Sequence, residues 1–562
     1  MPHLRRVFAV LALALVIAPL AASAPLFDPD EGLHAAIAQE MVQRGDYVTP
    51  TFMGEPFLDK PILFFWAEAA SLKLFGHDEA AVRIPPLMFG LFGMITVAML
   101  GRSLFGARAG LLAGIAYGTM LLPMGVSDVA VHDIGLVPFM CVAALCLNRA
   151  ASAPNGFAAS DSNALAASVP TSAATSALNP PVASAFRRKI LKYGIIAGIS
   201  LGLSILTKGL VGVVFTCIFA ACLAAYRPPA IGRLALVLTI AGLVAAIVAA
   251  PWYIAMERAH HGYLYYYFVE RHLHGYLTAT QRHGGRPFWY YVPIVVGGAL
   301  PWTGYLVGAA RIARRTPLRL VLWAWFVVGL VFLSIGESKL VTYALPLFPA
   351  LAILIGDYVD RATRSRDPFL GFAFLVHVAT LAMLPAIGLV LLRIKFDETR
   401  PLLWLAAIVI ALAILLTTRR AWRTGALVDG VVVASVLALV GLALVTPHAA
   451  AWMTGRDLAA ALNAGGTLPS RVSVLDERIG SLVFYLDPAL RADATKERVN
   501  EASFSEAMAR VRVDPADAVL AVRDAQLAKF NRLFAAAPVP EAHAGTFTIY
   551  RAGALREALK DR

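Results

Sequence analysis

The sequence is poor in charge. Charged residues make up 15% of the 562 residues, while 59% are hydrophobic. A soluble globular domain carries about 25% charged residues, so this composition excludes the ordinary soluble class. The apolar residues gather in repeated runs of roughly 18 to 25, the length that a helix needs to cross a bilayer. The composition therefore predicts a polytopic membrane protein.

Cysteine is scarce, and several common motifs are missing. The cysteines all lie inside apolar runs, which argues against a disulfide framework and favours small buried hydrophobes: Cys141, Cys146, Cys217 and Cys222. No G-x-x-x-x-G-K-[ST] loop is present, which weighs against ATP-driven work, and no H-E-x-x-H spacing indicates a metal site. The net charge of +13 gathers in alternate loops rather than on an aromatic and basic platform, so no nucleic-acid surface is expected.

Apolar runs predict thirteen membrane spans. The first run follows Arg5 and Arg6 and could instead be a signal peptide ending in Ala-Ser-Ala. We prefer an uncleaved span, because many more follow. The candidate spans are 7–25, 83–101, 108–126, 129–148, 189–206, 209–226, 232–255, 288–308, 318–335, 340–357, 369–392, 401–418 and 426–446.

Loop charges orient these spans. With the N-terminus inside, every predicted inner loop is basic, as the positive-inside rule expects. The residues concerned are Arg102, Arg108, Arg187, Arg188, Lys189, Arg227, Arg233, Arg311, Arg314, Arg315, Arg319, Arg361, Arg364, Arg366, Arg419, Arg420 and Arg423. One outer loop, 393–400, is also basic but contains Asp397 and Glu398. The inner loop 150–186, rich in Ala, Ser and Pro, is predicted to be a flexible insertion without chemistry.

The composition changes after residue 446. The stretches V-S-V-L-D, S-L-V-F-Y-L, A-V-L-A-V and T-F-T-I-Y-R are typical of short strands, and Glu501 to Val511 of a helix. The predicted fold class is therefore mainly α, a polytopic membrane protein with about 13 transmembrane helices and a small C-terminal α/β domain. The predicted division is a membrane domain, 1–449, with outer loops 26–82 and 256–287, and an outer domain, 450–562.

Ionisable residues gather on the predicted outer side. In the first outer loop, acids precede Lys60, and Gly32 to Arg44 is predicted to be an amphipathic helix at the membrane surface, with Asp30 and Glu31 at its beginning. A simple N-cap on a surface helix is the alternative for these two acids. The remaining outer residues are Asp28, Glu55, Asp59, Asp128, His132, Asp133, Lys208, His260, His261, Glu270, Arg271, His272, His274, Arg282, His283, Arg286, Glu337, Ser338, Lys339 and Tyr343.

Ionisable groups at membrane depth are costly and usually functional, so this collection predicts an outward-facing cavity at the membrane boundary. Asp133 stands out because it lies between the apolar residues Val131 and Ile134 at the start of a span. Lys208 and Lys339 have a simpler alternative, which is to extend to the interface. The tyrosines at 263 and 265–267 could likewise form an aromatic belt.

Seven motifs resemble one enzyme family. They are P-D-E at 29–31, G-D-Y-V-T-P at 45–50, D-K-P at 59–61, A-V-H-D at 130–133, L-T-K-G at 206–209, P-F-W-Y-Y at 287–291 and S-K-L-V-T-Y-A-L-P at 338–346. They resemble the bacterial aminoarabinose transferases (ArnT-like) within the protein-mannosyltransferase-like superfamily of GT-C membrane glycosyltransferases. The resemblance covers the whole membrane region in order, whereas the C-terminal part matches only in position and size.

The resemblance implies transfer of a sugar from polyprenyl (undecaprenyl) phosphate to lipid A or a related glycolipid, on the periplasmic side of the inner membrane. It implies that Asp30 and Asp133 are the catalytic and second cavity acids, and that Lys60 and Tyr343 contact the donor phosphate, with Arg271 a further candidate. Glu31, Asp59, Lys208 and Lys339 are predicted to line the cavity. The resemblance also allows a divalent metal ion at Asp59 and His272.

The sequence departs from the family at several of these positions. Leu33, His34 and Ala36 replace the family's Arg, Tyr and Glu, and Leu210 replaces a proline. Gly275 replaces an arginine, for which Arg271, Arg282 or Arg286 could serve. These changes fall on donor and acceptor contacts, so the sugar and the acceptor stay open, and a protein acceptor is one alternative.

The residues also fit this chemistry without the family name. A polyprenyl phosphate gains charge as it leaves, and a fixed Lys60 would stabilise that charge in the transition state. An acceptor hydroxyl would need a general base, for which Asp30 is the candidate, whereas an acceptor phosphate needs mainly orientation. A transporter of lipid-linked sugars is the rival from another class; it predicts internal repeats and mid-membrane acids, which the sequence does not show.

Overall fold

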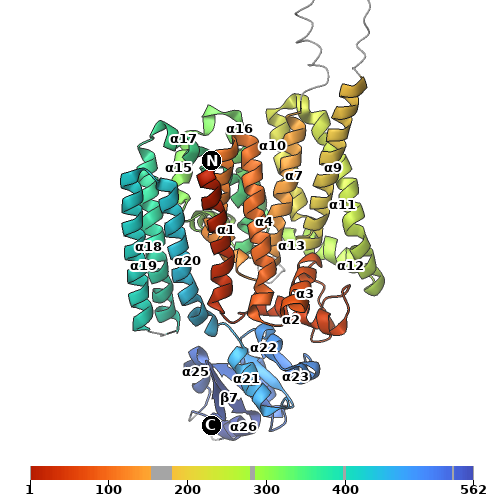
Figure 1. Cartoon of the computed structure of the whole chain (residues 1–562). Helices are drawn as coiled ribbons and strands as arrows, with labels where there is room; N and C mark the ends of the chain where they lie inside the picture. Colours follow the sequence, from red (N-terminus) through yellow and green to blue (C-terminus); the bar gives the residue numbers. More distant parts are fainter. Residues whose placement is uncertain (1, 154–179, 279–284, 397–399, 535–536, 561–562) are drawn as a thin grey trace, which may run out of the picture.

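The structure is a computed structural model in which residues 2–153, 180–278, 285–396, 400–534 and 537–560 are described. Long helices form a bundle, and a smaller unit with a β-sheet lies at one end of it (Figure 1). The mainly helical fold class with a C-terminal α/β unit is therefore confirmed. The predicted loop residues 154–179, together with Arg282, His283, Asp397 and Glu398, lie outside the described residues.

The long helices of the bundle have the following bounds: α1 (Pro2–Ala22), α4 (Glu79–Phe105), α5 (Ala107–Thr119), α6 (Leu121–Ser127), α7 (Leu136–Ala151), α9 (Pro180–Lys208), α10 (Val211–Tyr226), α11 (Ile231–Ala259), α14 (Tyr291–Gly298), α15 (Thr303–Arg311), α16 (Pro317–Ile335), α17 (Phe348–Ser365), α18 (Phe369–Phe396), α19 (Pro401–Thr424) and α20 (Leu427–Ala451). Short helices between them are η1 (His132–Gly135), η2 (Pro228–Ala230), η4 (Phe288–Tyr290), η5 (Ala313–Arg315) and η6 (Val341–Leu347).

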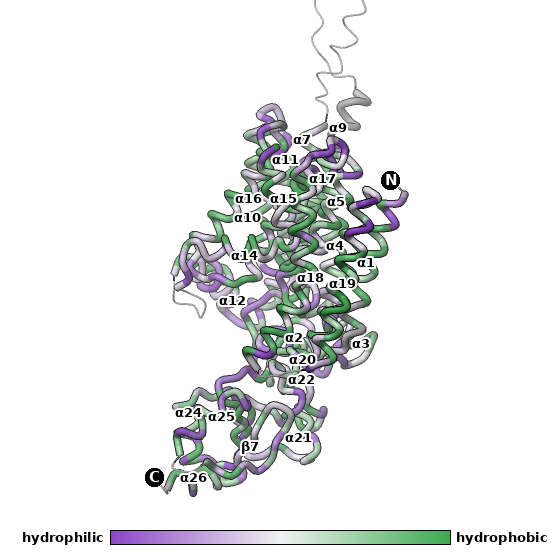
Figure 2. Tube along the Cα trace, turned by 90° about the vertical axis from the view of Figure 1, so that its left-hand side faces the viewer, coloured by the Kyte–Doolittle hydropathy of each residue, from purple (hydrophilic) through white to green (hydrophobic). Residues whose placement is uncertain are grey.

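Within the described residues, nine helices are long and apolar enough to cross a membrane, or up to eleven if two bent pairs each count as one span. The bent pairs are α5 with α6, at 65°, and α14 with α15, at 104°. Hydrophobic residues dominate along the bundle, whereas the C-terminal unit mixes both kinds (Figure 2). The chain is thus a multi-pass membrane protein. Each predicted span overlaps helical structure, with α1 and the shorter α10 among them, but the count of thirteen stays a prediction.

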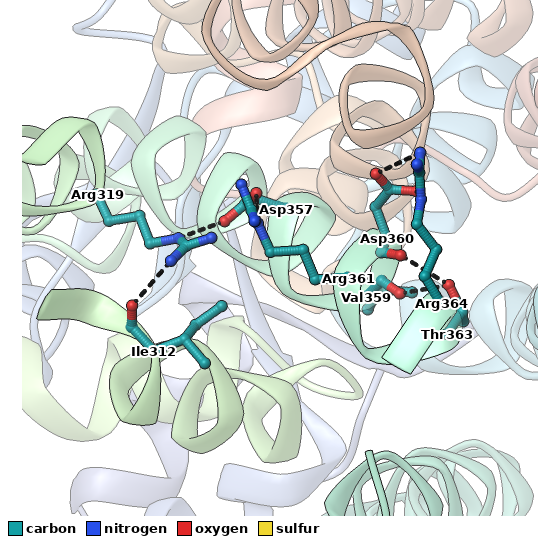
Figure 3. Close-up of polar contacts among 8 residues, drawn as sticks. All are labelled: Ile312, Arg319, Asp357, Val359, Asp360, Arg361, Thr363 and Arg364. Atoms are coloured by element: carbon teal, nitrogen blue, oxygen red, sulfur yellow. Dashed lines mark hydrogen bonds and ion pairs between the residues drawn. The ribbon is translucent and has the colours of Figure 1, made fainter. Parts of the chain in front are cut away.

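Charged residues at the start of α16 and near the end of α17 are paired with one another (Figure 3). Arg319 is buried and donates from Nε to Asp357 Oδ2 at 2.6 Å, and Arg361 donates to the other oxygen of Asp357 at 2.8 Å. Arg364 pairs in the same way with Asp360, at 3.0 Å. Asp360 also pairs with Arg108 of α5, at 3.2 Å. Because these carboxylates are satisfied by arginines of α17, α16 and α5, we assign this cluster to the packing of α16 and α5 on α17.

The opposite end of the bundle carries the two outer loops. The first contains α2 (Asp30–Arg44), a hairpin of β1 (Thr51–Phe52) with β2 (Glu55–Pro56), and α3 (Leu63–Phe75); the second contains α12 (Tyr263–Tyr265), a π-helix over Tyr266–His274, and α13 (Gly275–Leu277). The predicted helix is present as α2, and its placement on the membrane surface stays a prediction. Most of α2 is buried, from Glu31 to Met41, because it packs between α3 and the C-terminal unit.

The C-terminal unit is a five-stranded sheet in the order β4-β3-β5-β7-β6. Its elements are α21 (Arg456–Gly465), β3 (Val472–Leu475), α22 (Gly480–Tyr485), α23 (Pro488–Asp493), β4 (Val499–Ala502), α24 (Phe504–Val513), β5 (Val519–Arg523), α25 (Asp524–Asn531), β6 (Ala542–Ala544), β7 (Phe547–Arg551) and α26 (Ala552–Lys560). β3 pairs in parallel with β4 and β5, while β7 is antiparallel to β5 and β6.

Three of the four stretches predicted as strands are strands, and the helix predicted from Glu501 is present as α24. The prediction for S-L-V-F-Y-L is wrong, since this stretch is the helix α22. A short, wholly apolar run does not distinguish a buried strand from a buried helix. Here α22 is covered on one side by α2 and on another by α21, so all of its faces need apolar residues.

Candidate functional site

A cavity of about 470 Å³ lies between the outer ends of the helices, below the second outer loop. Its polar wall comes from the D-K-P motif before α3, from η1, from the end of α9 and from the π-helix. The predicted site residues that line it are Asp59, Lys60, Asp133, Lys208, Arg271, His272 and Tyr343. Five separate motifs of the sequence therefore meet at one cavity.

Acid and base pairs occupy most of the polar wall. Lys208 at the end of α9 forms an ion pair with Asp133, and its Nζ lies 4.2 Å from the centre of the Tyr343 ring. Arg271 donates to Asp59 Oδ2 at 2.8 Å, and the Tyr266 hydroxyl donates to Asp59 Oδ1 at 2.7 Å. The two carboxylates are thus each held by a cation, which sets their orientation toward the cavity.

Lys60 differs from these cations. Among the described residues, the structure gives its ammonium group no ion pair and no hydrogen bond, although it lines the cavity. Lys208 and Arg271 are already paired with carboxylates. An unpaired ammonium beside a cavity attracts an anion more strongly than a paired one does, because no internal partner has to be displaced.

The other wall of the cavity is apolar. It is formed by Leu210, just before α10, and by residues of α10, α13, α16 and η6: Val211, Val214, Tyr276, Phe332, Leu333 and Pro346. These side chains offer dispersion contacts and remove hydrocarbon from water, but they provide few hydrogen bonds. A molecule with an anionic head and a hydrocarbon tail matches both walls at once.

Asp30 is near this site but is not part of the cavity lining. It lies exposed in the first turn of α2, one turn before the buried His34. His34 Nδ1–H donates to the Ala130 carbonyl at 2.7 Å, and the His34 ring is 4.6 Å from that of His132. Burial lowers the pKa of His34, and the Asp30 carboxylate partly opposes this shift. Lys60 and Asp133 also act on His34, so Asp30 lies at the same corner of the site.

The prediction that Glu31 and Lys339 line the cavity is wrong for the described residues. Glu31 is fully buried and forms a two-bond ion pair with Arg83 of α4, at 3.0 Å for each bond. Lys339 is 3% exposed and donates to the Arg286 carbonyl at 3.3 Å, so it does not extend to the interface either. The charges of Glu31 and Lys339 therefore serve packing: Glu31 fixes α2 on α4, and Lys339 binds the segment at Arg286.

The Glu31–Arg83 pair gives a stability prediction. Glu31→Gln should lower the free energy of unfolding by about 3–5 kcal/mol, because it leaves a buried guanidinium without its counter-charge. Thermal unfolding in detergent measures this. The matched control is Glu68→Gln, since Glu68 of α3 is equally buried, its oxygens have no hydrogen-bond partner in the described part of the chain, and burial raises its pKa well above the usual value. A neutral amide should fit there, so equal destabilisation by both variants would contradict the prediction.

His272 is held against the L-T-K-G motif. Its Nδ1–H donates to the Tyr267 carbonyl at 2.7 Å, and its ring lies 4.6 Å from that of Tyr267. Gly209 has a φ of +78°, and a Cβ at this position would lie 2.2 Å from His272 Nε2. The glycine is therefore required twice, for its backbone conformation and for the space that His272 occupies.

We predict that Gly209→Ala lowers turnover by about 10- to 100-fold, because it pushes His272 and Tyr267 out of the cavity wall. Gly242→Ala in α11 is the matched control, since no atom lies within 4 Å of its Cβ position. Turnover and the melting temperature of both variants are measured in the same detergent. Wild-type turnover in Gly209→Ala would show that the position of His272 does not matter.

A metal ion fits poorly at the residues predicted for it. Both oxygens of Asp59 are engaged, by Tyr266 and Arg271, and His272 has only Nε2 left to offer. In the described part of the chain, no group of three or more His, Cys, Asp or Glu side chains is arranged to hold a metal. We therefore derive no step of the reaction through a metal ion.

Several residues of the site cannot be identified from the sequence. Tyr266, expected in an aromatic belt, binds Asp59, and Tyr263 and Tyr267 are buried in a stack of rings with Tyr253 rather than placed at an interface. The apolar wall is not predicted at all. An apolar side chain inside a span looks the same whether it faces lipid, protein or a cavity, so no signal in the sequence could have found it.

The fold and the site together define a multi-pass membrane protein of the GT-C fold. The structure superposes on ArnT from Cupriavidus metallidurans bound to undecaprenyl phosphate with a TM-score of 0.72, at 22% identity and over 97% of both chains. The family model described as dolichyl-phosphate-mannose-protein mannosyltransferase matches residues 59–160, which include D-K-P and A-V-H-D.

Sequence relatives agree with this fold. The chain is 30% identical to an undecaprenyl phosphate-α-4-amino-4-deoxy-L-arabinose arabinosyl transferase of Erwinia tasmaniensis over 426 residues, 72% of this chain and 70% of the relative. It is also 30% identical to such transferases of Proteus mirabilis and Aeromonas salmonicida, over 56% and 62% of their lengths, which is less than two thirds of each. The chain belongs to this ArnT-like family of membrane glycosyltransferases.

Proposed function

We propose that the protein transfers a sugar from undecaprenyl phosphate to lipid A or a related glycolipid. The observation that carries this proposal is the two-sided cavity, which Lys60 lines without a carboxylate partner among the described residues and which also has an apolar wall. A polyprenyl phosphate has the two matching parts, a phosphate and a long hydrocarbon. The names of the relatives, and the ligand of the Cupriavidus structure, support the same class of donor.

In the proposed reaction, an acceptor oxygen attacks the anomeric carbon of the sugar as its bond to the phosphate oxygen breaks. Lys60 and Tyr343 hold the departing phosphate, and its growing negative charge is stabilised by the Lys60 ammonium. Asp30 takes the proton when the acceptor is a hydroxyl. Asp133 orients Lys208 beside Tyr343. One displacement inverts the anomeric centre, and no second carboxylate is needed for a covalent intermediate.

The proposed location is the bacterial inner membrane, with the site toward the periplasm. Basic residues of the predicted inner loops support this orientation. The end of α16 and the segment before α17 line the cavity, whereas Arg319 lies at the start of α16 and Arg361 and Arg364 near the end of α17. In the same proposal, residues 1–449 form the catalytic membrane domain and residues 450–562 a soluble periplasmic domain.

Mass spectrometry of lipid A and total glycolipid, from cells with and without the protein, tests the proposal. We expect an added pentosamine mass on lipid A only when the protein is present. Unchanged lipid A with another glycolipid lost would keep the reaction and replace the acceptor. A modified protein in place of a glycolipid would agree with the mannosyltransferase family model instead. Lipid-linked sugar that crosses the membrane without transfer would overturn the proposal in favour of a transporter.

A further inference from the structure

Asp28, from the membrane part of the chain, is bound by the C-terminal unit. It lies at the edge of the sheet where open sheets with this strand order usually bind a ligand. After β3 the chain moves to β4 on one side, and after β4 it crosses to β5 on the other side of β3. In open sheets with this strand order, the crevice beyond the carboxyl ends of the two central strands is the usual binding site. Here those strands are β3 and β5, which end at Leu475 and Arg523.

Asp28, in the connection between α1 and α2, fills this crevice. Ser481, which follows β3, donates its backbone N–H to Asp28 Oδ1 at 3.0 Å and its hydroxyl to Asp28 Oδ2. Arg523 at the end of β5 acts on the same carboxyl and is paired with Glu477, at 3.0 Å. The Asp28 N–H in turn donates to the Met453 carbonyl at 2.8 Å, so side chain and backbone are both bound.

Close backbone contact reinforces this binding. A Cβ on Gly32 of α2 would lie 2.3 Å from the Ser481 nitrogen, and a Cβ on Gly480 would lie 2.3 Å from the Leu33 nitrogen. The two helices α2 and α22 therefore touch through their backbones at the first turn of α2. The Tyr485 hydroxyl extends the contact by accepting the Leu26 N–H at 2.8 Å and donating to Glu79 at 2.9 Å.

The bound segment leads directly into the site. Asp30 is two residues beyond Asp28 and in the same turn as Gly32, and its own side chain is exposed. Because the Asp30 side chain is exposed, its position depends mainly on the backbone on either side of it. On one side that backbone is held by the C-terminal unit, and on the other by the Glu31–Arg83 pair.

We propose that the C-terminal unit is an internal clamp, in which the crevice at Ser481 binds Asp28 and thereby positions Asp30 for the transfer reaction. The inference rests on the proposed function, because Asp30 is the acid of that reaction. Asp28, Ser481 and the Gly32–Gly480 contact are positioning elements, since none of them lines the cavity. The crevice is occupied by Asp28 of the same chain.

The clamp predicts a loss of turnover without a loss of donor binding. In Gly480→Ala and in Asp28→Ala, kcat should fall about 10- to 100-fold, the effect expected of a reacting group misplaced by about 1 Å. The dissociation constant for undecaprenyl phosphate should stay within about twofold, because Lys60 and Tyr343 are positioned by other elements. Hydrogen exchange should become faster in residues 28–34 and 480–485.

Two matched variants separate the clamp from simple damage. Asp28→Asn should keep more of kcat than Asp28→Ala, because the amide oxygen can still accept the Ser481 N–H and the amide NH₂ can donate to the Ser481 hydroxyl oxygen. Gly465→Ala, in α21 of the same unit and with no atom within 4 Å of its Cβ position, should change neither turnover nor exchange. If Gly480→Ala fails to fold, Ser481→Ala takes its place with a smaller loss of kcat.

The results distinguish the two proposals. Faster exchange in residues 28–34 with unchanged kcat would overturn the clamp and leave the transferase intact, as would a donor affinity that falls as much as kcat. A wild-type protein that binds undecaprenyl phosphate but transfers no sugar would contradict the proposed function alone. The clamp is then judged by hydrogen exchange, and slow exchange of residues 28–34 in Gly480→Ala would overturn it.

Discussion

Asp30→Asn should lower kcat by about 10²- to 10⁴-fold while leaving the affinity for undecaprenyl phosphate unchanged. The range is that of a positioned general base, which an amide cannot replace. Donor affinity should persist because Asp30 is not part of the cavity wall that contains Lys60 and Tyr343. Single-turnover transfer and equilibrium binding, measured on the same purified protein, give the two quantities separately.

The control for Asp30→Asn is Glu55→Gln, which neutralises an exposed acid of the same loop that is paired with Lys496 of the C-terminal unit. It should keep full turnover. Full transfer by Asp30→Asn would mean that the acceptor arrives already ionised, as a phosphate does, and that orientation alone is sufficient. The proposed base would then be wrong, while the donor site would stand.

The membrane helices could be predicted well because each one depends on a single continuous stretch of the sequence. A span must carry about 20 apolar residues in a row, and each predicted segment overlaps helical structure. The residues of the polar wall could be predicted from the sequence for a related reason. Residues such as Asp133 are costly inside an apolar region, so their presence in the sequence is enough to indicate a role.

Contacts between distant parts of the chain left no such signal. Asp28 and Ser481 are 453 residues apart, and neither residue is unusual in its local sequence. Glu31 and Asp30 are neighbours with the same charge, yet one is buried against Arg83 and the other is exposed. The difference arises from the turn of α2, which directs adjacent side chains to different faces, and from which element happens to cover each face.

Lys60→Met should lower kcat by about 10²- to 10³-fold and should also weaken binding of undecaprenyl phosphate. Methionine keeps most of the length and apolar character of the side chain but removes the charge that would stabilise the leaving phosphate. Lys60 has no ion pair or hydrogen bond among the described residues, so its removal leaves no buried carboxylate unpaired and should not destabilise the fold. The melting temperature should therefore stay near that of the wild type.

A loss of kcat without a change in melting temperature distinguishes Lys60 from the other cations of the cavity. Lys208→Met would leave Asp133 without its partner and should lower stability and turnover together. Lys73→Met, an exposed lysine of α3, is the surface control and should change neither quantity. Strong loss of kcat in Lys60→Met with an unchanged melting temperature would assign Lys60 to the phosphate. Equal turnover in the two variants Lys60→Met and Lys73→Met would place the phosphate elsewhere in the cavity, and Arg271 would be the next residue to test.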